Sequence, residues 1–180
     1  HTAIRRQRQM CIRDRDRGSD GATDFSQDAF DAFLIGRQIL DNAAKAGTLT
    51  AEAQSALNSQ ISIASKTWEK CIAATVVHYI NDVSADMGEY QAPDFASLGN
   101  FKTMAKHWGE MKGFALALQF SPYSPFRDGS VEGIDLDDLK RVLDLMGDAP
   151  VLADGSQGGI PVSGSAAVSY THLRAHETSP

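Results

Sequence analysis

The sequence predicts an all-α fold: a helical bundle of three long helices plus a short C-terminal helix. Apolar residues recur at three- and four-residue steps through most of residues 26–146, which is the period of an amphipathic α-helix. The stretches between these segments are marked by glycine and proline, residues that interrupt helices. No segment shows the alternation of a half-buried strand, and no internal repeat is present.

The first predicted helix covers residues 26–46. Ser26 can cap its start and Gly47 can close its end, because a hydroxyl accepts hydrogen bonds from free N–H groups and glycine adopts the left-handed backbone readily. The larger apolar residues fall near one stripe of this helix, as do some alanines: Phe30, Phe33, Leu34, Leu40 and Ala44. This spacing is typical of a helix that packs through one face.

The second predicted helix opens at Thr50 and can run to about Met87. Within it, Cys71 to Ile80 is apolar on nearly every side, and a helix that is apolar all round is a buried one. We therefore expect the central helix of the bundle here, with Cys71 buried. A loop follows, marked by Gly88, Pro93 and Gly99.

The third predicted long helix has Asn100 as its cap and is stopped by Pro122 and Pro125. One continuous apolar face runs along it: Phe101, Met104, Trp108, Met111, Ala115 and Leu118. A row of small residues lies beside that face, each four positions from the next: Ala105, Gly109, Gly113 and Ala117. A glycine inside a helix costs roughly 1 kcal/mol relative to alanine. The row therefore predicts close approach by a neighbouring backbone.

The last predicted helix is short, beginning after Asp135 and ending at Gly147. Four apolar residues are expected to point inward from it: Leu136, Leu139, Leu143 and Met146. Residues 154–167 are rich in glycine and serine, a composition typical of a linker. The helical bundle fragment is thus expected at residues 16–153.

The two ends of the chain look foreign to the rest. A basic run such as Arg5 to Arg8 otherwise indicates a nucleic-acid or localisation patch, or a solvated tail. Residues 1–15 instead look like the forward translation of a transposase-based sequencing adapter. Residues 168–180 look like the reverse complement of the same element running into the opposite adapter. We expect both ends to be disordered, adapter-derived tails.

Setting these ends aside makes the chain strongly acidic. Lys and Arg fall from 17 to 11 and Asp and Glu from 23 to 21, so the net charge changes from −6 to −10. Such a domain repels phosphate backbones, which argues against nucleic acid as a partner. The zinc-like spacing of His172 and His176 lies in the adapter translation, as does Cys11, and the remaining Cys71 cannot form an internal disulfide.

Two histidines remain, and each lies on a predicted long helix. His107 and Glu110 are three residues apart, so they share a helix face and can point at one object. An imidazole and a carboxylate are a start on a transition-metal site, which bundles build from facing helices. Two structural alternatives stay open: His78 hydrogen-bonded to a neighbouring helix within the core, and Glu110 paired with Lys106 on a wet face.

Three segments resemble the C-terminal part of a bacterial domain-of-unknown-function family, number 4856, of predicted cell-envelope lipoproteins. They are FDAFLIGR (Phe30 to Arg37), VVHYIND (Val76 to Asp82) and HWGEMKGFALALQFSPYSPF (His107 to Phe126). The similarity spans roughly residues 25–152. That family is in turn distantly similar to imelysin-like proteins, two-part helical bundles associated with iron uptake, whose hallmark is Gly-x-His-x-x-Glu. His107 and Glu110 match that hallmark, while Ala105 replaces its glycine.

The resemblance implies half of a larger two-part helical domain, whose partner is the missing N-terminal half. It implies a location in the cell envelope, periplasmic or on the outer membrane, with membrane attachment only through a lipid anchor outside this fragment. It also implies that His107 and Glu110, with His78 as a third candidate, bind a divalent transition metal, either iron or zinc.

Three function classes follow from these observations. The first is an envelope metal-binding or iron-acquisition accessory protein, and the second is a non-catalytic helical interaction domain. The third, a peptidase-like hydrolase, ranks last because the sequence has no H-E-x-x-H helix and no G-x-S-x-G elbow. The sequence therefore favours a protein that is not an enzyme.

Overall fold

A computed structural model describes residues 24–89, 97–127, 129–150, 156–157 and 160–161. The described residues form three long helices and one short helix: α2 (Phe25–Ala46), α3 (Ala51–Glu89), α4 (Leu98–Ala117) and α5 (Leu136–Leu145). This confirms the predicted all-α bundle. Within the expected linker, β1 (Ser156–Gln157) pairs antiparallel with β2 (Ile160–Pro161). The two expected terminal tails lie outside the described residues.

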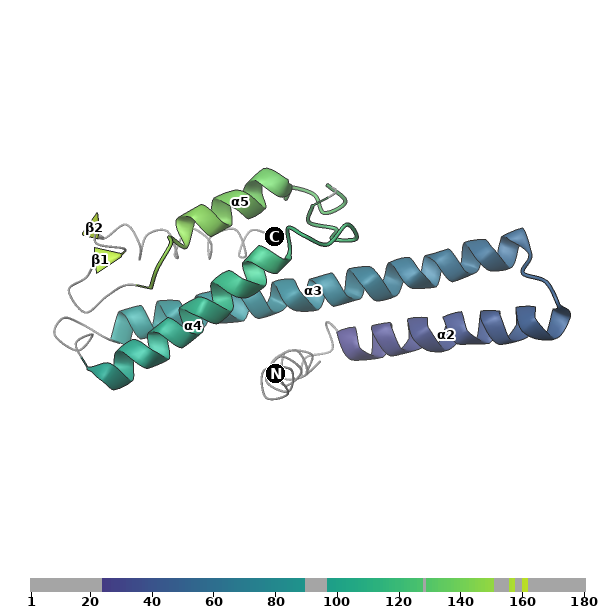
Figure 1. Ribbon diagram of the computed structural model, residues 1–180, viewed down its shortest axis with the longest axis horizontal. Helices are drawn as coiled ribbons and strands as arrows, with labels where there is room; N and C mark the ends of the chain where they lie inside the picture. The colour runs from purple at the N-terminus through teal and green to yellow at the C-terminus, as the bar shows by residue number, and fades with distance from the viewer. Residues whose placement is uncertain (1–23, 90–96, 128, 151–155, 158–159, 162–180) are drawn as a thin grey trace.

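The 39-residue helix α3 is the longest of the described helices, and both α2 and α4 pack against it. Figure 1 shows α2 running back along the N-terminal half of α3, while α4 runs along its C-terminal half and α5 lies over α4. The central position predicted for this helix is thus confirmed, but its two neighbours cover different halves of its length. We call α2 with residues 51–68 the arm, and residues 69–89 with α4 and α5 the base.

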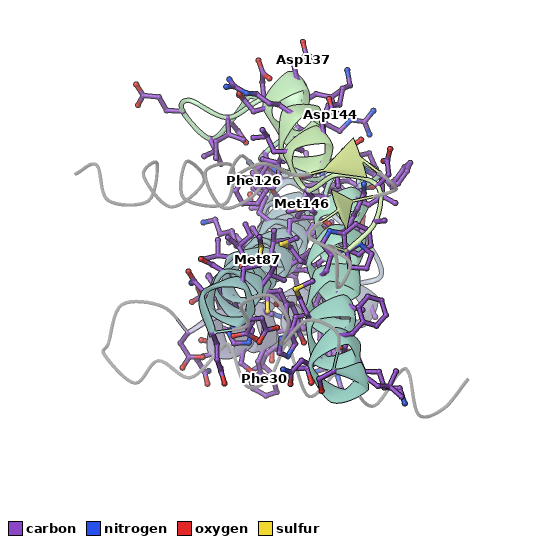
Figure 2. The ribbon with its side chains drawn as sticks, turned by 90° about the vertical axis from the view of Figure 1, so that its left-hand side faces the viewer. Phe30, Met87, Phe126, Asp137, Asp144 and Met146 are labelled. Carbon is purple, nitrogen blue, oxygen red and sulfur yellow. The ribbon has the colours of Figure 1, made fainter. Side chains whose placement is uncertain are left out.

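The apolar core lies in the base. Its buried residues come from three helices: Val76, Tyr79, Ile80 and Val83 of α3, Met104, Met111, Ala115 and Leu118 near α4, and Leu139 and Met146 near α5. Met87 and Phe126 pack against this cluster, and Figure 2 shows them with Met146 between the helices. The predicted apolar face of α4 is therefore the face that packs, and Cys71 is buried as predicted.

The arm is held together by small residues. Ala32 and Gly36 are the buried residues of α2, and a Cβ on Gly36 would lie 3.5 Å from a Leu57 methyl carbon. The larger residues of the predicted stripe are exposed instead: Phe30 at 62%, Phe33 at 71%, Leu34 at 54% and Leu40 at 49%. The reason is geometric, since α2 has one neighbouring helix and one seam cannot cover a wide apolar stripe.

The small residues of α4 do not have the predicted role. Gly109 and Gly113 are exposed, and a Cβ added at either would meet nothing within 4 Å. The prediction of a close backbone approach at these glycines is therefore wrong. At Gly36 of α2, where the two helices of the arm meet, the neighbouring atoms belong to the side chains of Leu57 and Gln60.

Helix ends agree with the sequence where a glycine or an aspartate sets them. Gly47 has the left-handed φ of 74° that ends α2, and Asp135 forms a capping box with Asp138 at the start of α5. The hydroxyl of Thr50 accepts a hydrogen bond from the Ala53 amide. Each cap satisfies N–H or carbonyl groups that a helix end leaves free.

Two predicted caps are wrong by a few residues. Asp24 rather than Ser26 caps α2, because its carboxylate accepts a hydrogen bond of 2.9 Å from the Gln27 amide. Helix α4 begins at Leu98 after Ser97, ahead of Asn100. In both cases the chain is already helical at the residue that the sequence suggested as the cap.

Candidate functional site

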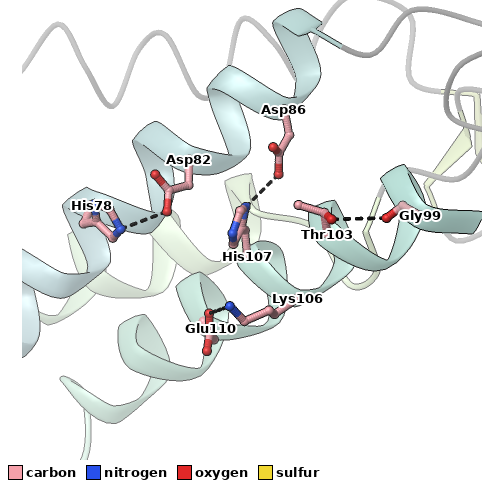
Figure 3. Close-up of polar contacts among 8 residues, drawn as sticks. All are labelled: His78, Asp82, Asp86, Gly99, Thr103, Lys106, His107 and Glu110. Atoms are coloured by element: carbon pink, nitrogen blue, oxygen red, sulfur yellow. Dashed lines mark hydrogen bonds and ion pairs between the residues drawn. The ribbon is translucent and has the colours of Figure 1, made fainter. Parts of the chain in front are cut away.

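An imidazole–carboxylate pair joins the two long helices of the base. Nδ1 of His107 in α4 lies 2.8 Å from Oδ2 of Asp86 in α3, across 21 positions of sequence. Only 21% of the histidine side chain and 10% of the aspartate side chain are exposed. Figure 3 shows His107 reaching toward Asp86 from the facing helix. A buried carboxylate needs a donor, and this imidazole supplies one.

Aromatic packing holds the His107 ring in place. The Tyr79 ring lies 6.1 Å from it, and Tyr79 itself stacks on Phe114 with centroids 6.0 Å apart. In a neutral imidazole whose Nδ1 donates to Asp86, Nε2 is the remaining acceptor. The pair therefore fixes both the direction of the ring and its tautomer.

Glu110 takes a different partner from His107. Its Oε2 lies 3.8 Å from Nζ of Lys106 on the same helix and is buried without a hydrogen bond. Figure 3 places Glu110 beside Lys106, away from the Asp86 carboxylate that His107 reaches. The two side chains thus go to separate places rather than to the common target that their spacing suggests.

His78, the third predicted ligand, lies one helix away from Glu110. Its Nε2 is 2.8 Å from Oδ2 of Asp82, four residues on in α3, and both side chains are partly exposed. The His78 ring packs edge-on against Tyr79, with centroids 5.1 Å apart. Tyr79 therefore contacts both histidines, and each histidine pairs with its own aspartate.

These pairs do not assemble into a metal centre by themselves. Among the described residues, no group of three or more His, Cys, Asp or Glu side chains is placed to hold a metal ion. A structural metal site takes about four protein ligands and a catalytic one about three. A metal at His107 would need ligands from outside the described part of the chain.

A second interhelical anchor fixes the C-terminal end of α5. The Trp108 indole donates a hydrogen bond of 2.9 Å to the Met146 carbonyl, and Lys112 donates to the Gly147 carbonyl. The Lys112 ammonium also lies 5.5 Å from the centre of the Trp108 ring. These donors satisfy carbonyls that the end of a helix leaves free. Trp108 and Lys112 therefore hold the end of α5 against α4.

The sequence could have revealed one aspartate of the site but not the other. Asp82 follows His78 by four residues, which places the two on one helix face. Asp86 is separated from His107 by the last turn of α3, the connection to α4 and about two and a half turns of α4. Only the packing of α4 on α3 brings these two together.

Comparisons with protein-family models, curated proteins and solved structures find no match for this chain. None of the described helices combines the length and the apolar character needed to cross a bilayer. The contacts above and the exposed surface of the arm are therefore the features that bear on function.

Proposed function

We propose that this chain is a non-catalytic helical interaction domain, in which the base is a rigid support and the arm presents the binding surface. The observation that carries this proposal is the exposed apolar side of the arm. It includes Phe30, Phe33 and Leu40 of α2, and Ile61 and Trp68 of α3, each about half exposed or more. Contiguous apolar surface of this kind marks interaction sites in soluble proteins.

The arrangement around His107 supports a structural role for that histidine. Its Nδ1 is taken by Asp86 and its ring is packed by Tyr79. An Asp–His pair is also part of a nucleophilic triad, but a triad needs a hydroxyl or thiol at Nε2. No described residue provides that hydrogen bond to His107. The pair instead links α3 to α4.

The interaction role can be tested by selecting binders from a library of amphipathic helical peptides displayed against the full chain. We expect enrichment of peptides with an apolar stripe, and loss of their binding in Phe33→Glu. Ile35→Glu is the matched control, because Ile35 is a 47% exposed apolar residue of the same helix that lies on the other side of the arm. If no peptide is enriched, or if both variants bind equally, the proposal fails.

A metal-binding role is the second candidate, favoured by the Asp86–His107 pair itself. A carboxylate that holds one ring nitrogen of a histidine while the other binds metal is a recurring arrangement. Iron or zinc at Nε2 would be completed by groups outside the described residues. The resemblance to envelope lipoproteins supports this role and a location in the cell envelope.

Metal analysis of the purified chain separates the two candidates. Iron or zinc bound in a stoichiometric amount, and lost in both His107→Ala and Glu110→Ala, would support the metal role. Metal content that is unchanged in both variants would remove it. His78→Ala tests the third predicted ligand in the same way, and its metal content should match that of His107→Ala only if the two imidazoles share one ion.

A further inference from the structure

Five of the eight large exposed apolar residues of the arm lie toward one of its two faces. In a helix, each residue turns by about 100°. Phe33 and Leu40 therefore lie about 60–80° to one side of the α2 seam through Ala32 and Gly36. On α3, Ile61 and Trp68 lie in the same rotational sense, about 70° and 50° from the middle of the seam formed by Leu57 and Gln60. In an antiparallel pair of helices, residues that are rotated away from the seam in the same sense lie on the same side of the pair. Phe33 and Leu40 of α2 therefore share a face with Ile61 and Trp68 of α3.

The level of these residues along the arm also matches. Gly36 packs against Leu57 and Gln60, which places Phe33 level with Ile61. Phe30 extends the row toward Trp68, and Figure 2 shows the Phe30 side chain at the outer edge of the molecule. We call this set the apolar face of the arm: Phe30, Phe33, Leu40, Ile61 and Trp68.

The apolar face continues a packing surface that the chain already uses. Along α3, apolar residues recur at steps of seven and four, on one stripe: Ile61, Trp68, Ile72, Tyr79 and Val83. Helix α4 covers the C-terminal part of this stripe, where Tyr79 and Val83 are buried and Ile72 is partly buried. From Trp68 toward the N-terminus of α3, the residues of this stripe are exposed to solvent. The exposed part therefore has the pattern of a helix-packing surface.

The charge around this face suits a second copy of the same chain. The chain carries a net charge of −6, which would oppose self-association. On the helical wheel, however, Asp28, Asp31 and Glu52 fall on the opposite side of the arm. The charged residues bordering the apolar face are Arg37 and Asp41, a pair of opposite sign whose Nε and Oδ2 atoms lie 3.9 Å apart. The border of the face therefore carries no net charge, and two such faces can meet without net repulsion.

The apolar face supplies a large share of the area that a stable pair needs. An aromatic residue can bury about 150–250 Å², so the exposed parts of Phe30, Phe33 and Trp68 supply roughly 300–400 Å². A stable interface takes about 800 Å² from each partner. The three rings supply about half of that area, and the aliphatic residues Leu40 and Ile61 add to it.

We propose that the apolar face is covered by the same face of a second copy, so that two arms form an antiparallel four-helix bundle. A two-helix arm supplies half of such a bundle, and a face that meets itself gives a closed two-fold dimer. This inference rests on the proposed interaction function, and it names the partner.

Sedimentation of the full chain tests the dimer. We expect twice the monomer mass of 19.4 kDa, with a dissociation constant that rises about 30-fold or more in Phe33→Glu and in Trp68→Glu, the change expected at an interface hot spot. The controls are Ile35→Glu and Ile63→Glu, which alter equally apolar, exposed residues on the opposite face. Circular dichroism must show unchanged helicity in all four variants.

Three outcomes would overturn the dimer. They are a monomeric wild-type chain at every concentration measured, a dimer that persists in both apolar-face variants, and control variants that dissociate as readily as these. If the wild type is monomeric while selected peptides still lose binding to Phe33→Glu, the second copy is excluded and the interaction function survives. If neither dimer nor peptide binding is found, both proposals fail.

Discussion

At the scale of single residues, the buried Asp86 carboxylate decides how α3 and α4 meet. A carboxylate that is 10% exposed has lost most of its water, and that loss is costly unless a donor replaces it. His107 is the donor, and Tyr79 holds the donor's ring. The pair therefore stabilises one register of α4 on α3, and a shift of α4 along α3 would lose this hydrogen bond.

Removing one member of this pair should destabilise the fold. We expect His107→Ala to lower the free energy of unfolding by about 1–3 kcal/mol, because Asp86 is left buried without a donor. Asp86→Ala should cost less, since an imidazole can turn toward water. Urea denaturation measures both. The control is Lys106→Ala on the same turn, where an exposed side chain in a 3.8 Å pair should change stability by less than about 0.5 kcal/mol.

The double variant tests whether the two residues act together. If they do, His107→Ala with Asp86→Ala should lose less stability than the two single losses added, by about 0.5–3 kcal/mol. Strictly additive losses would mean that the pair contributes nothing as a pair, and the structural role proposed for His107 would then have to be abandoned.

A surface pair on α5 gives a direct electrostatic test. The pKa of Asp137 lies below its usual value because Lys140 donates a hydrogen bond to the carboxylate and adds its positive charge. A depressed pKa in the folded state means that this contribution is present above the usual carboxyl pKa and is lost as pH falls through the folded value. Lys140→Ala should raise the Asp137 pKa. Carboxyl carbon shifts in an NMR titration would show an unchanged value if the contact is absent in solution.

The sequence identified the candidate site residues more reliably than it identified the residues that they contact. Spacing placed His107 and Glu110 on one helix face, but residues three apart can still turn to opposite edges of that face, and Glu110 goes to Lys106. The partner of His107 depends on the register between two helices. Side-chain spacing within α4 carries no information about that register.

At the scale of elements, periodicity fixed which segments are helical but not always which face packs. For α4 the apolar face is also the packed face, because α3 and α5 cover it from two sides. For α2 the larger apolar residues are exposed and the seam is formed by Ala32 and Gly36. The difference is the number of neighbouring helices, which is a property of the tertiary fold.

The glycines of α4 should be replaceable. Gly109 and Gly113 are exposed, lie in the helix and have open space where a Cβ would go. Gly109→Ala should therefore raise the free energy of unfolding by about 0.5–1 kcal/mol, because alanine loses less backbone entropy on folding. Thermal denaturation of Gly109→Ala and Gly113→Ala measures this. A loss of stability in either variant would show that something packs against this edge of α4.

At the scale of the whole molecule, one long helix carries two regions of very different packing. The base buries methionines, valine and tyrosine from three helices, and Met104, Met111 and Met146 are almost wholly inaccessible. The arm buries little beyond a seam of small residues. Apolar burial supplies most of the free energy of folding, so the molecule joins a stable base to a weakly stabilised arm.

This division predicts a gradient of local stability along α3. Amide hydrogen exchange should be slowest near Val83 and Met111, in the core of the base, and faster by orders of magnitude in α2 and in the first turns of α3. The measurement should use Phe33→Glu, so that a second copy does not protect the arm. In the wild type, protection of α2 should increase with protein concentration, because a dimer stabilises the state that binds. Uniform protection along α3 in the variant would mean that the arm and the base unfold as one unit, and concentration-independent protection of α2 would remove the arm from the dimer interface.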